Sequence, residues 1–307
     1  MLEDVWRETG AACARRGGRR VLIELGERNL RVWTSVRGAG ETVVLVSGAG
    51  ADHVGWGLSS RLLSRRFRTV AFDQRGTGRT EGPREGLSVP LLAEDLAHLL
   101  DRGEIAPEGE RVHVVGHSLG TRVALAACAL RPERVKSLTL FAPWEGDDAY
   151  LARQTAIRHE MLTRGSRQSA AEMLLFLLTS RTFQNQDPAR FRQYLDAMFL
   201  GPEAPPWETI VEQLEIGLNW KLTDETIARI RVPILVITAE HDHMTPQVYG
   251  EAMAKRLRAP HVALRGERAS HLAHVEMPEV FAEVVGTFLA RVGRAAEGDP
   301  TPRPTPS

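Results

Sequence analysis

Apolar runs typical of buried strands recur in both the N-terminal and the C-terminal part of the chain. Each is four to eight residues long, and most are followed by a stretch with the spacing of an amphipathic helix. The predicted strands are 20–25, 29–36, 42–46, 69–72, 112–115, 135–141, 233–239 and 261–264. The predicted helices between them are 56–66, 88–100, 119–130, 246–257 and 278–292. This alternation predicts an α/β fold with a doubly wound, mostly parallel sheet.

The alternation stops over residues 144–230, where the sequence shows no apolar strand. Stretches with helical spacing fill this segment, at 149–164, 167–180, 188–200, 207–220 and 223–230. We therefore expect an all-helical cap, 144–230, inserted into an α/β core formed by 19–143 and 231–292. The proline-rich end, 293–307, is expected to be a disordered tail. Residues 1–18 fit either a short amphipathic helix or an irregular leader.

The composition excludes several classes of function. Basic and acidic residues number 39 each, which argues against nucleic acid or an anionic membrane as the main partner. Cys13 and Cys128 form neither a disulfide framework nor a metal pattern. The N-terminus lacks the features of a signal peptide, and no run approaches the length of a membrane span. We expect a cytoplasmic protein, a monomer or homodimer, that acts on a small molecule and does not insert into membranes.

Ser118 lies where a predicted buried strand meets a predicted helix. It is flanked by glycines in the pattern Gly116-His-Ser-Leu-Gly120. A turn this sharp leaves no room for side chains on either side of the serine, and it exposes the hydroxyl in a strained backbone. The N-terminus of the following helix presents free N–H groups toward a developing negative charge. The sequence therefore predicts a nucleophile at Ser118.

A serine nucleophile needs a base, and the base needs an acid to orient it. His271 follows the predicted strand 261–264, and Asp242 follows the predicted strand 233–239. Both positions lie beyond the carboxyl ends of strands, where open α/β sheets build their sites. We therefore expect Ser118, Asp242 and His271 to form a catalytic triad.

These patterns resemble the α/β-hydrolase fold superfamily over about residues 20–292. The resemblance rests on the elbow at 116–120 and on the triad order Ser, Asp, His. It also rests on the loop 73–80, Asp-Gln-Arg-Gly-Thr-Gly-Arg-Thr, which is similar to the family's Asp-x-Arg-Gly-x-Gly-x-Ser/Thr. The branch that it resembles contains carboxylesterases and proline iminopeptidases with a helical cap.

Two further segments resemble the acid and histidine loops of that family. Pro246 stands four residues after the acid, and Glu276 and Pro278 follow the histidine. Two positions depart from the family pattern. Ser47-Gly48 replaces the usual His-Gly, and Thr121 stands where a second glycine is common.

The same geometry predicts an oxyanion hole made of two backbone N–H groups. One is expected from Leu119, the residue after the nucleophile. The other is expected from Ala49, in the small-residue loop after the strand 42–46. No cofactor is implied by any motif.

Other residues compete for these roles. His274 is a less favoured base, because its spacing to the following proline does not match the family's histidine loop. His241 and His243 flank the acid, but alternate residues of a short loop rarely converge, and nothing nearby completes a metal site. The strand ending at residue 141 offers alternative acids at Glu145, Asp147 and Asp148.

The cap is rich in large apolar residues, so its underside should line a hydrophobic substrate pocket. The expected lining residues are Trp56, Trp144, Phe176, Trp207 and Met244. The leading interpretation is a carboxylesterase-like serine hydrolase that cleaves an ester, thioester or lactone of a largely apolar substrate through an acyl-enzyme. The sequence leaves open an aminopeptidase-like amide hydrolase. It also leaves open a non-hydrolytic member, such as a cyclase, an acyltransferase or a ligand-binding protein.

Overall fold

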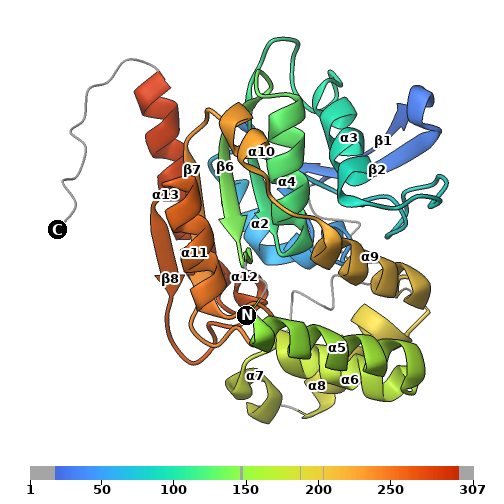
Figure 1. The fold of residues 1–307 in the computed structure, drawn as a ribbon. Coiled ribbons are helices and arrows are strands. Elements are labelled where there is room, and N and C mark those ends of the chain that lie inside the picture. The colour runs from blue at the N-terminus through green and yellow to red at the C-terminus, as the bar shows by residue number, and fades with distance from the viewer. Residues whose placement is uncertain (1–17, 146–147, 187, 203, 297–307) are drawn as a thin grey trace.

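The computed structural model describes residues 18–145, 148–186, 188–202 and 204–296. Its strands form a single sheet in the order β1-β2-β4-β3-β5-β6-β7-β8 (Figure 1). The strands are β1 (Arg19–Leu25), β2 (Leu30–Arg37), β3 (Thr42–Val46), β4 (Arg68–Phe72), β5 (Val112–His117), β6 (Val135–Phe141), β7 (Ile234–Ala239) and β8 (His261–Leu264). Strand β2 runs antiparallel to both β1 and β4, and the pairs from β4 to β8 in the sheet order are all parallel. This confirms the predicted doubly wound, mostly parallel sheet.

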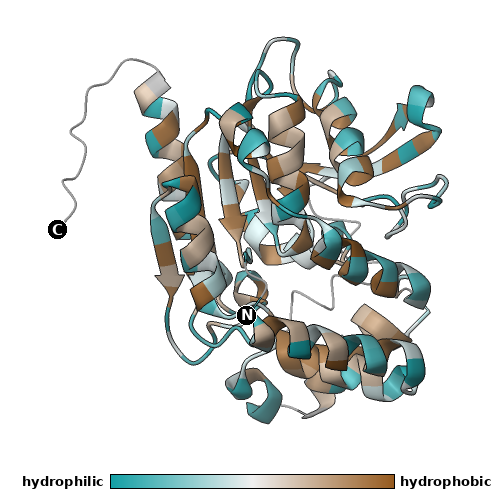
Figure 2. Ribbon diagram, viewed as in Figure 1, coloured by the Kyte–Doolittle hydropathy of each residue, from teal (hydrophilic) through white to brown (hydrophobic). Residues whose placement is uncertain are grey.

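Helices cover both faces of the sheet. One face carries α3 (Val89–Leu100), α4 (Leu119–Leu130) and α11 (Gln247–Leu257), and the other carries α2 (Gly57–Leu63) and α13 (Pro278–Ala296). Side chains alternate across a strand. Accordingly, Val44 and Val46 of β3 belong to the buried cluster under α3 and α4, whereas Val43 and Leu45 belong to the cluster under α13. The central strands therefore bury apolar side chains on both faces of the sheet, and Figure 2 shows hydrophobic residues along them.

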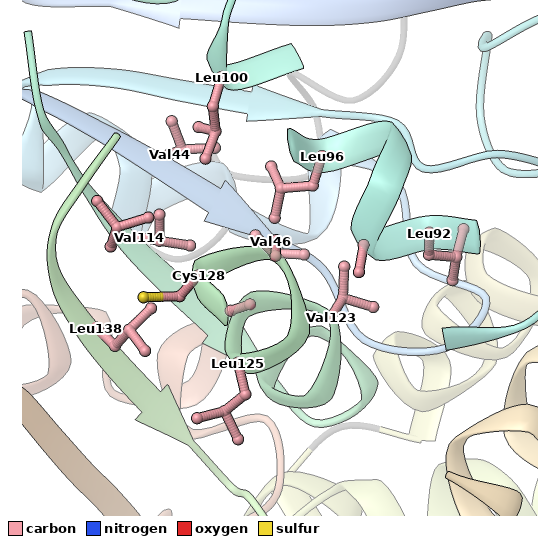
Figure 3. Close-up of a cluster of buried hydrophobic side chains, with 14 of the residues drawn as sticks. Val44, Val46, Leu92, Leu96, Leu100, Val114, Val123, Leu125, Cys128 and Leu138 are labelled. Atoms are coloured by element: carbon pink, nitrogen blue, oxygen red, sulfur yellow. The ribbon is translucent and has the colours of Figure 1, made fainter. Parts of the chain in front are cut away.

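The cluster under α3 and α4 fixes the helix that follows Ser118. Figure 3 shows Leu96 of α3 and Val123 of α4 meeting over the β3 residues Val44 and Val46. Cys128 is buried in this cluster, and burial raises the pKa of its thiol to about 12. Its role is to fill the core.

The segment between β6 and β7 is helical. It contains α5 (Ala149–Arg164), α6 (Arg167–Leu178), α7 (Arg181–Gln186), α8 (Pro188–Leu195), a π-helical turn (Asp196–Leu200), α9 (Trp207–Asn219) and α10 (Asp224–Arg229). Helices α5 to α8 lie together at one end of the sheet (Figure 1). Helix α10 instead packs against α4, and the flanking Leu222 and Ile230 belong to the core cluster.

The tail was predicted to begin at residue 293, which is before the last helix ends. Helix α13 continues to Ala296, so residues 293–296 are helical. This last turn lies against the carboxylate of Glu41, 2.9 Å from where a β-carbon at position 293 would stand. The rest of the tail and the predicted N-terminal leader, residues 1–17, lie outside the described residues. Among the helices that are described, none is long and apolar enough to cross a membrane.

Candidate active site

Ser118 occupies a sharp turn between β5 and α4. Its backbone has φ 52° and ψ −119°, in the region that favours glycine and is strained for a serine. A β-carbon at Gly116 would lie 2.8 Å from the N atom of Thr121, and one at Gly120 would overlap the carbonyl oxygen of Val46. Both glycines are therefore required for the turn, because it leaves no room for a side chain at either position, as the sequence suggests.

Thr121 helps to hold the turn closed. Its backbone N–H and its hydroxyl both donate to the carbonyl oxygen of Ser118, at 2.9 and 2.7 Å. The backbone N–H of Ser118 donates to the carbonyl of Phe141 on the neighbouring strand. The departure from the family pattern at position 121 thus adds a hydrogen bond to the elbow.

The loop after β3 lies beside the nucleophile. A β-carbon at Gly48 would lie 3.3 Å from Cβ of Ser118. The N–H of Gly50 donates to Oε1 of Gln213 at 2.8 Å. The N–H of the preceding residue, Ala49, has no acceptor among the described residues. Leu119 is the first residue of α4, so its N–H also lacks an intrahelical acceptor.

Asp242 and His271 form a buried pair at the ends of β7 and β8. Oδ2 of Asp242 lies 2.8 Å from Nδ1 of His271. Because a carboxylate only accepts, Nδ1 carries the proton, and Nε2 is left as the basic nitrogen. Oδ1 of Asp242 accepts from the N–H groups of Met244 and Thr245, at 2.9 and 2.8 Å, and the Thr245 hydroxyl donates to Oδ2. The carboxylate is therefore held rigidly for one orientation of the imidazole.

His117 links the turn at Ser118 to His271. It immediately precedes Ser118, and its Nε2 donates to the backbone oxygen of His271 at 3.0 Å. Its ring stacks on Phe141 and lies 4.8 Å, centroid to centroid, from the ring of His271. Burial, together with the charges of His274 and His271, lowers the pKa of His117 well below that of a free histidine. His117 therefore stays neutral and holds the histidine loop against the elbow.

The competing base, His274, lies behind the site. It is buried, with its ring 4.5 Å from that of His117 and 5.0 Å from that of Trp56. Burial, with a smaller effect of His271, lowers its pKa to about 3. His241 and His243 are exposed, and neither belongs to a group of possible metal ligands among the described residues.

The alternative acids after β6 have partners other than His271. Glu145 forms an ion pair with Arg256, and Asp148 caps α5 by accepting from the N–H of Leu151 at 2.9 Å. Asp147 lies outside the described residues. Among those that are described, the carboxylate that meets His271 is that of Asp242.

The described residues contain one cluster of possible metal ligands, Asp52, His53 and Asp73. Asp73 Oδ1 accepts from the backbone and the ring of His53, at 2.8 and 2.6 Å, and its Oδ2 accepts from the N–H of Arg79 at 2.8 Å. Its carboxylate is thus fully used in shaping the loop 73–80.

The five predicted pocket residues divide into two groups. Trp144 and Met244 lie near the site, because a β-carbon at Gly217 would touch both Trp144 and Leu119, and because Met244 donates its N–H to Asp242. The other three predictions need correction. Trp56 is 1% exposed and packs under the sheet with Phe281, since the turn before α2 directs its ring inward.

Phe176 is 57% exposed on the outer face of α6, because the buried side of that helix is already filled by Leu174 and Leu175. Trp207 packs inside the helical segment, where its Nε1 donates to the carbonyl of Leu162.

Two buried polar residues connect the cap with the core through contacts that the motifs do not indicate. Glu276 accepts from the N–H of Ser180, at the end of α6, and from the hydroxyl of Ser270, beside His271, at 2.9 and 2.6 Å. Gln213 of α9 binds the N–H of Gly50 and the carbonyl of Arg75. Both contacts join residues far apart in the sequence, so no local pattern predicts them.

Comparison with known proteins places this geometry in a family. The family model described as "Alpha/beta hydrolase family" matches residues 43–284. The protein named "Putative carbamate hydrolase RutD" from Azorhizobium caulinodans is 26% identical over 265 residues, which cover 85% of this chain and 96% of that protein.

Solved structures agree with the sequence comparison. A hydrolase from Pseudomonas aeruginosa PA01 superposes with a TM-score of 0.71 at 26% identity, covering 89% of this chain and 99% of that one. A thermophilic esterase from Thermogutta terrifontis shares the fold, with a TM-score of 0.73 at 24% identity, over 90% of this chain and 99% of that one. The chain belongs to the alpha/beta hydrolase family.

Proposed function

We propose that this hydrolase cleaves a carboxylic ester, thioester or lactone with Ser118 as nucleophile and through an acyl-enzyme intermediate. The observation that carries the proposal is the buried Asp242–His271 pair, at 2.8 Å, tied through His117 to a serine in a strained turn. A carboxylate, an imidazole and a hydroxyl in this order are what nucleophilic acyl transfer requires.

The chemistry follows from the proton on Nδ1 of His271. Nε2 takes the proton of the Ser118 hydroxyl while Oγ attacks the carbonyl carbon of the substrate. Asp242 stabilises the imidazolium that forms. The imidazolium then gives its proton to the leaving group, and a water molecule, activated by the same nitrogen, hydrolyses the acyl-enzyme.

The oxyanion of each tetrahedral intermediate is assigned to the free N–H groups of Ala49 and Leu119. These groups are fixed before the reaction, because Gly50 is bound by Gln213 and because Leu119 begins a buried helix. Donors that need no reorganisation stabilise the transition state most, and loss of one costs on the order of 100- to 1,000-fold in rate.

The surroundings favour a largely apolar substrate. The buried cluster inside the cap reaches the site through Met244 of the acid loop, Ile210 above the Gly50 loop and Val275 of the histidine loop. The names of the relatives, a carbamate hydrolase and an esterase, support a carbonyl compound as substrate.

Triad variants test the proposal. Replacement of Ser118, Asp242 or His271 by Ala should lower kcat/KM for p-nitrophenyl esters on the order of 10⁴- to 10⁶-fold, with double variants scarcely worse than single ones. His241→Ala, an exposed histidine beside the acid, is the matched control and should retain activity. Losses that add across the three positions would contradict the triad.

A further inference from the structure

Two arginines are buried without a carboxylate partner. Arg122 is 5% exposed and Arg158 is 7% exposed, and no carboxylate of the described residues forms an ion pair with either guanidinium. The other deeply buried arginines differ, because Arg75 pairs with Asp95 and Arg134 with Asp101. A buried cation without a partner lowers the stability of the folded state. Each of these two arginines therefore needs a structural or a functional explanation.

Arg122 is explained by its own surroundings. Its guanidinium donates to the carbonyl oxygens of Trp220 and Trp144, at 2.7 and 3.1 Å. It also lies 4.0 Å from the centre of the Trp144 ring and 5.5 Å from that of Trp220. Carbonyl oxygens and aromatic faces together stabilise a buried guanidinium. Arg122 is thus a structural clamp between α4 and the two ends of the cap.

Arg158 has no comparable partners. Among the described residues it contacts the sulfur of Met244, and its Nη2 lies 3.5 Å from the hydroxyl of Thr155, at the limit of a hydrogen bond. A thioether is a weak acceptor, and a guanidinium carries five N–H donors. Nη1 and Nη2 of Arg158 therefore meet only weak or distant acceptors among the described residues.

Arg158 lies on the buried face of α5, among less polar side chains. The spacing Leu151, Thr155, Arg158, Leu162 places these side chains on one side of the helix, toward the body of the protein. This side rests on the acid loop, where Gln154 donates to the carbonyl of His243 at 2.6 Å. The arginine is thus held over the loop that carries the triad acid.

The charge of Asp242 acts on Arg158, but no ion pair joins the two side chains among the described residues. Its oxygens already accept from His271, Met244 and Thr245. Burial lowers the pKa of Arg158 and the charge of Asp242 raises it in part. The guanidinium remains a cation at neutral pH, in contact with Met244 of the acid loop and with only weak acceptors around it.

We propose that Arg158 binds a carboxylate of the substrate, so that the preferred substrate is an ester, thioester or lactone with one acidic group at the end of an apolar chain. The inference rests on the proposed function, which places the scissile carbonyl at Ser118. The planar fork of a guanidinium matches a carboxylate with two parallel hydrogen bonds. In this proposal the apolar chain packs on Met244 and the cap cluster, so Arg158 adds a single charge to otherwise apolar surroundings.

Paired esters with the same leaving group test this proposal. The neutral substrate is p-nitrophenyl valerate, and the acidic one is the mono-p-nitrophenyl ester of glutaric acid. In Arg158→Met, kcat/KM for the acidic ester should fall on the order of 10- to 100-fold, mainly through KM, because a hydrogen-bonded charge pair is lost. The neutral ester should be cleaved within about 3-fold of the wild-type rate.

Two further variants separate charge from packing. Arg158→Lys keeps the charge without the fork and should restore part of the preference for the acidic ester. Arg153→Met removes an exposed arginine from the same helix and should change neither rate. Equal losses on both esters in Arg158→Met, or a wild type with no preference for the acidic ester, would overturn the proposal.

A binding measurement distinguishes failure of this inference from failure of the proposed function. Calorimetric titration of Ser118→Ala with glutarate requires no catalysis. Binding that is weakened at least 10-fold by a second change, Arg158→Met, supports the carboxylate site even if the wild type cleaves neither ester. Binding that is unchanged by Arg158→Met refutes the site even if both esters are cleaved at Ser118.

Discussion

Replacement of His274 by Phe should make the protein more resistant to acid. His274 is 4% exposed, its Nδ1 has no hydrogen-bond partner, and its ring lies 5.0 Å from Trp56 and 6.0 Å from Phe281. A phenyl ring has a similar size and suits these aromatic neighbours. The variant removes a group that burial keeps neutral, with its pKa lowered to about 3.

The size of the effect follows from the difference in proton binding. In the unfolded chain a histidine titrates near pH 6.5, so between about pH 6.5 and pH 3 the unfolded state binds a proton that the folded state does not. The free energy of unfolding therefore falls as the pH falls, by up to about 1.4 kcal/mol per pH unit. From pH 7 to pH 5, His274 should account for about 2 kcal/mol of lost stability.

Urea-induced unfolding at pH 7 and pH 5 measures this contribution. The wild type should lose about 2 kcal/mol more than His274→Phe over this interval. His241→Ala, which removes an exposed histidine, should follow the wild type. An equal pH dependence in His274→Phe and in the wild type would refute the buried, neutral state of this side chain. The variant should also retain the proposed esterase activity, because His274 lies behind the site.

Three other substitutions probe the supports of the site. Gly120→Ala would place a methyl group on the carbonyl oxygen of Val46, so it should destabilise the fold by about 1–3 kcal/mol and lower kcat, as urea unfolding and steady-state kinetics would show. Ser180→Ala removes one donor to the buried carboxylate of Glu276 and should lower the free energy of unfolding by about 1–3 kcal/mol. An unchanged urea midpoint would contradict the proposed link between the cap and the histidine loop. Arg122→Met removes the clamp between the two ends of the cap, so amide hydrogen exchange around residues 144 and 220 should become faster while exchange in the central strands does not.

Much of the fold could be predicted from local patterns. The helix predicted over 149–164 has these bounds in α5, because Asp148 provides an N-cap and the apolar spacing is regular. The strand 42–46 was equally clear from its apolar run. In contrast, α7 is short and polar. Ser180 caps its start by accepting from the N–H of Phe183, but the residues that follow show no apolar spacing that would predict a helix.

The pocket was the least predictable part of the molecule. An apolar stretch such as 173–178 shows that α6 packs on something, but not which side chain faces outward, so Phe176 could not be excluded from the lining. Likewise, Trp56 follows a loop and looked accessible, yet the turn before α2 directs it into the core. The supports of the site, Gln213 and Glu276, depend on contacts across more than 90 positions of the chain.

Labelling with a small fluorophosphonate tests the central claim most directly, because it requires an activated serine and no knowledge of the substrate. The account predicts one adduct per chain, located by peptide mass spectrometry at Ser118. It predicts no adduct in Ser118→Ala, and labelling at least 100-fold slower in His271→Ala. An adduct on another residue, or labelling of His271→Ala at the wild-type rate, would contradict the assignment of Ser118 and His271 as nucleophile and base.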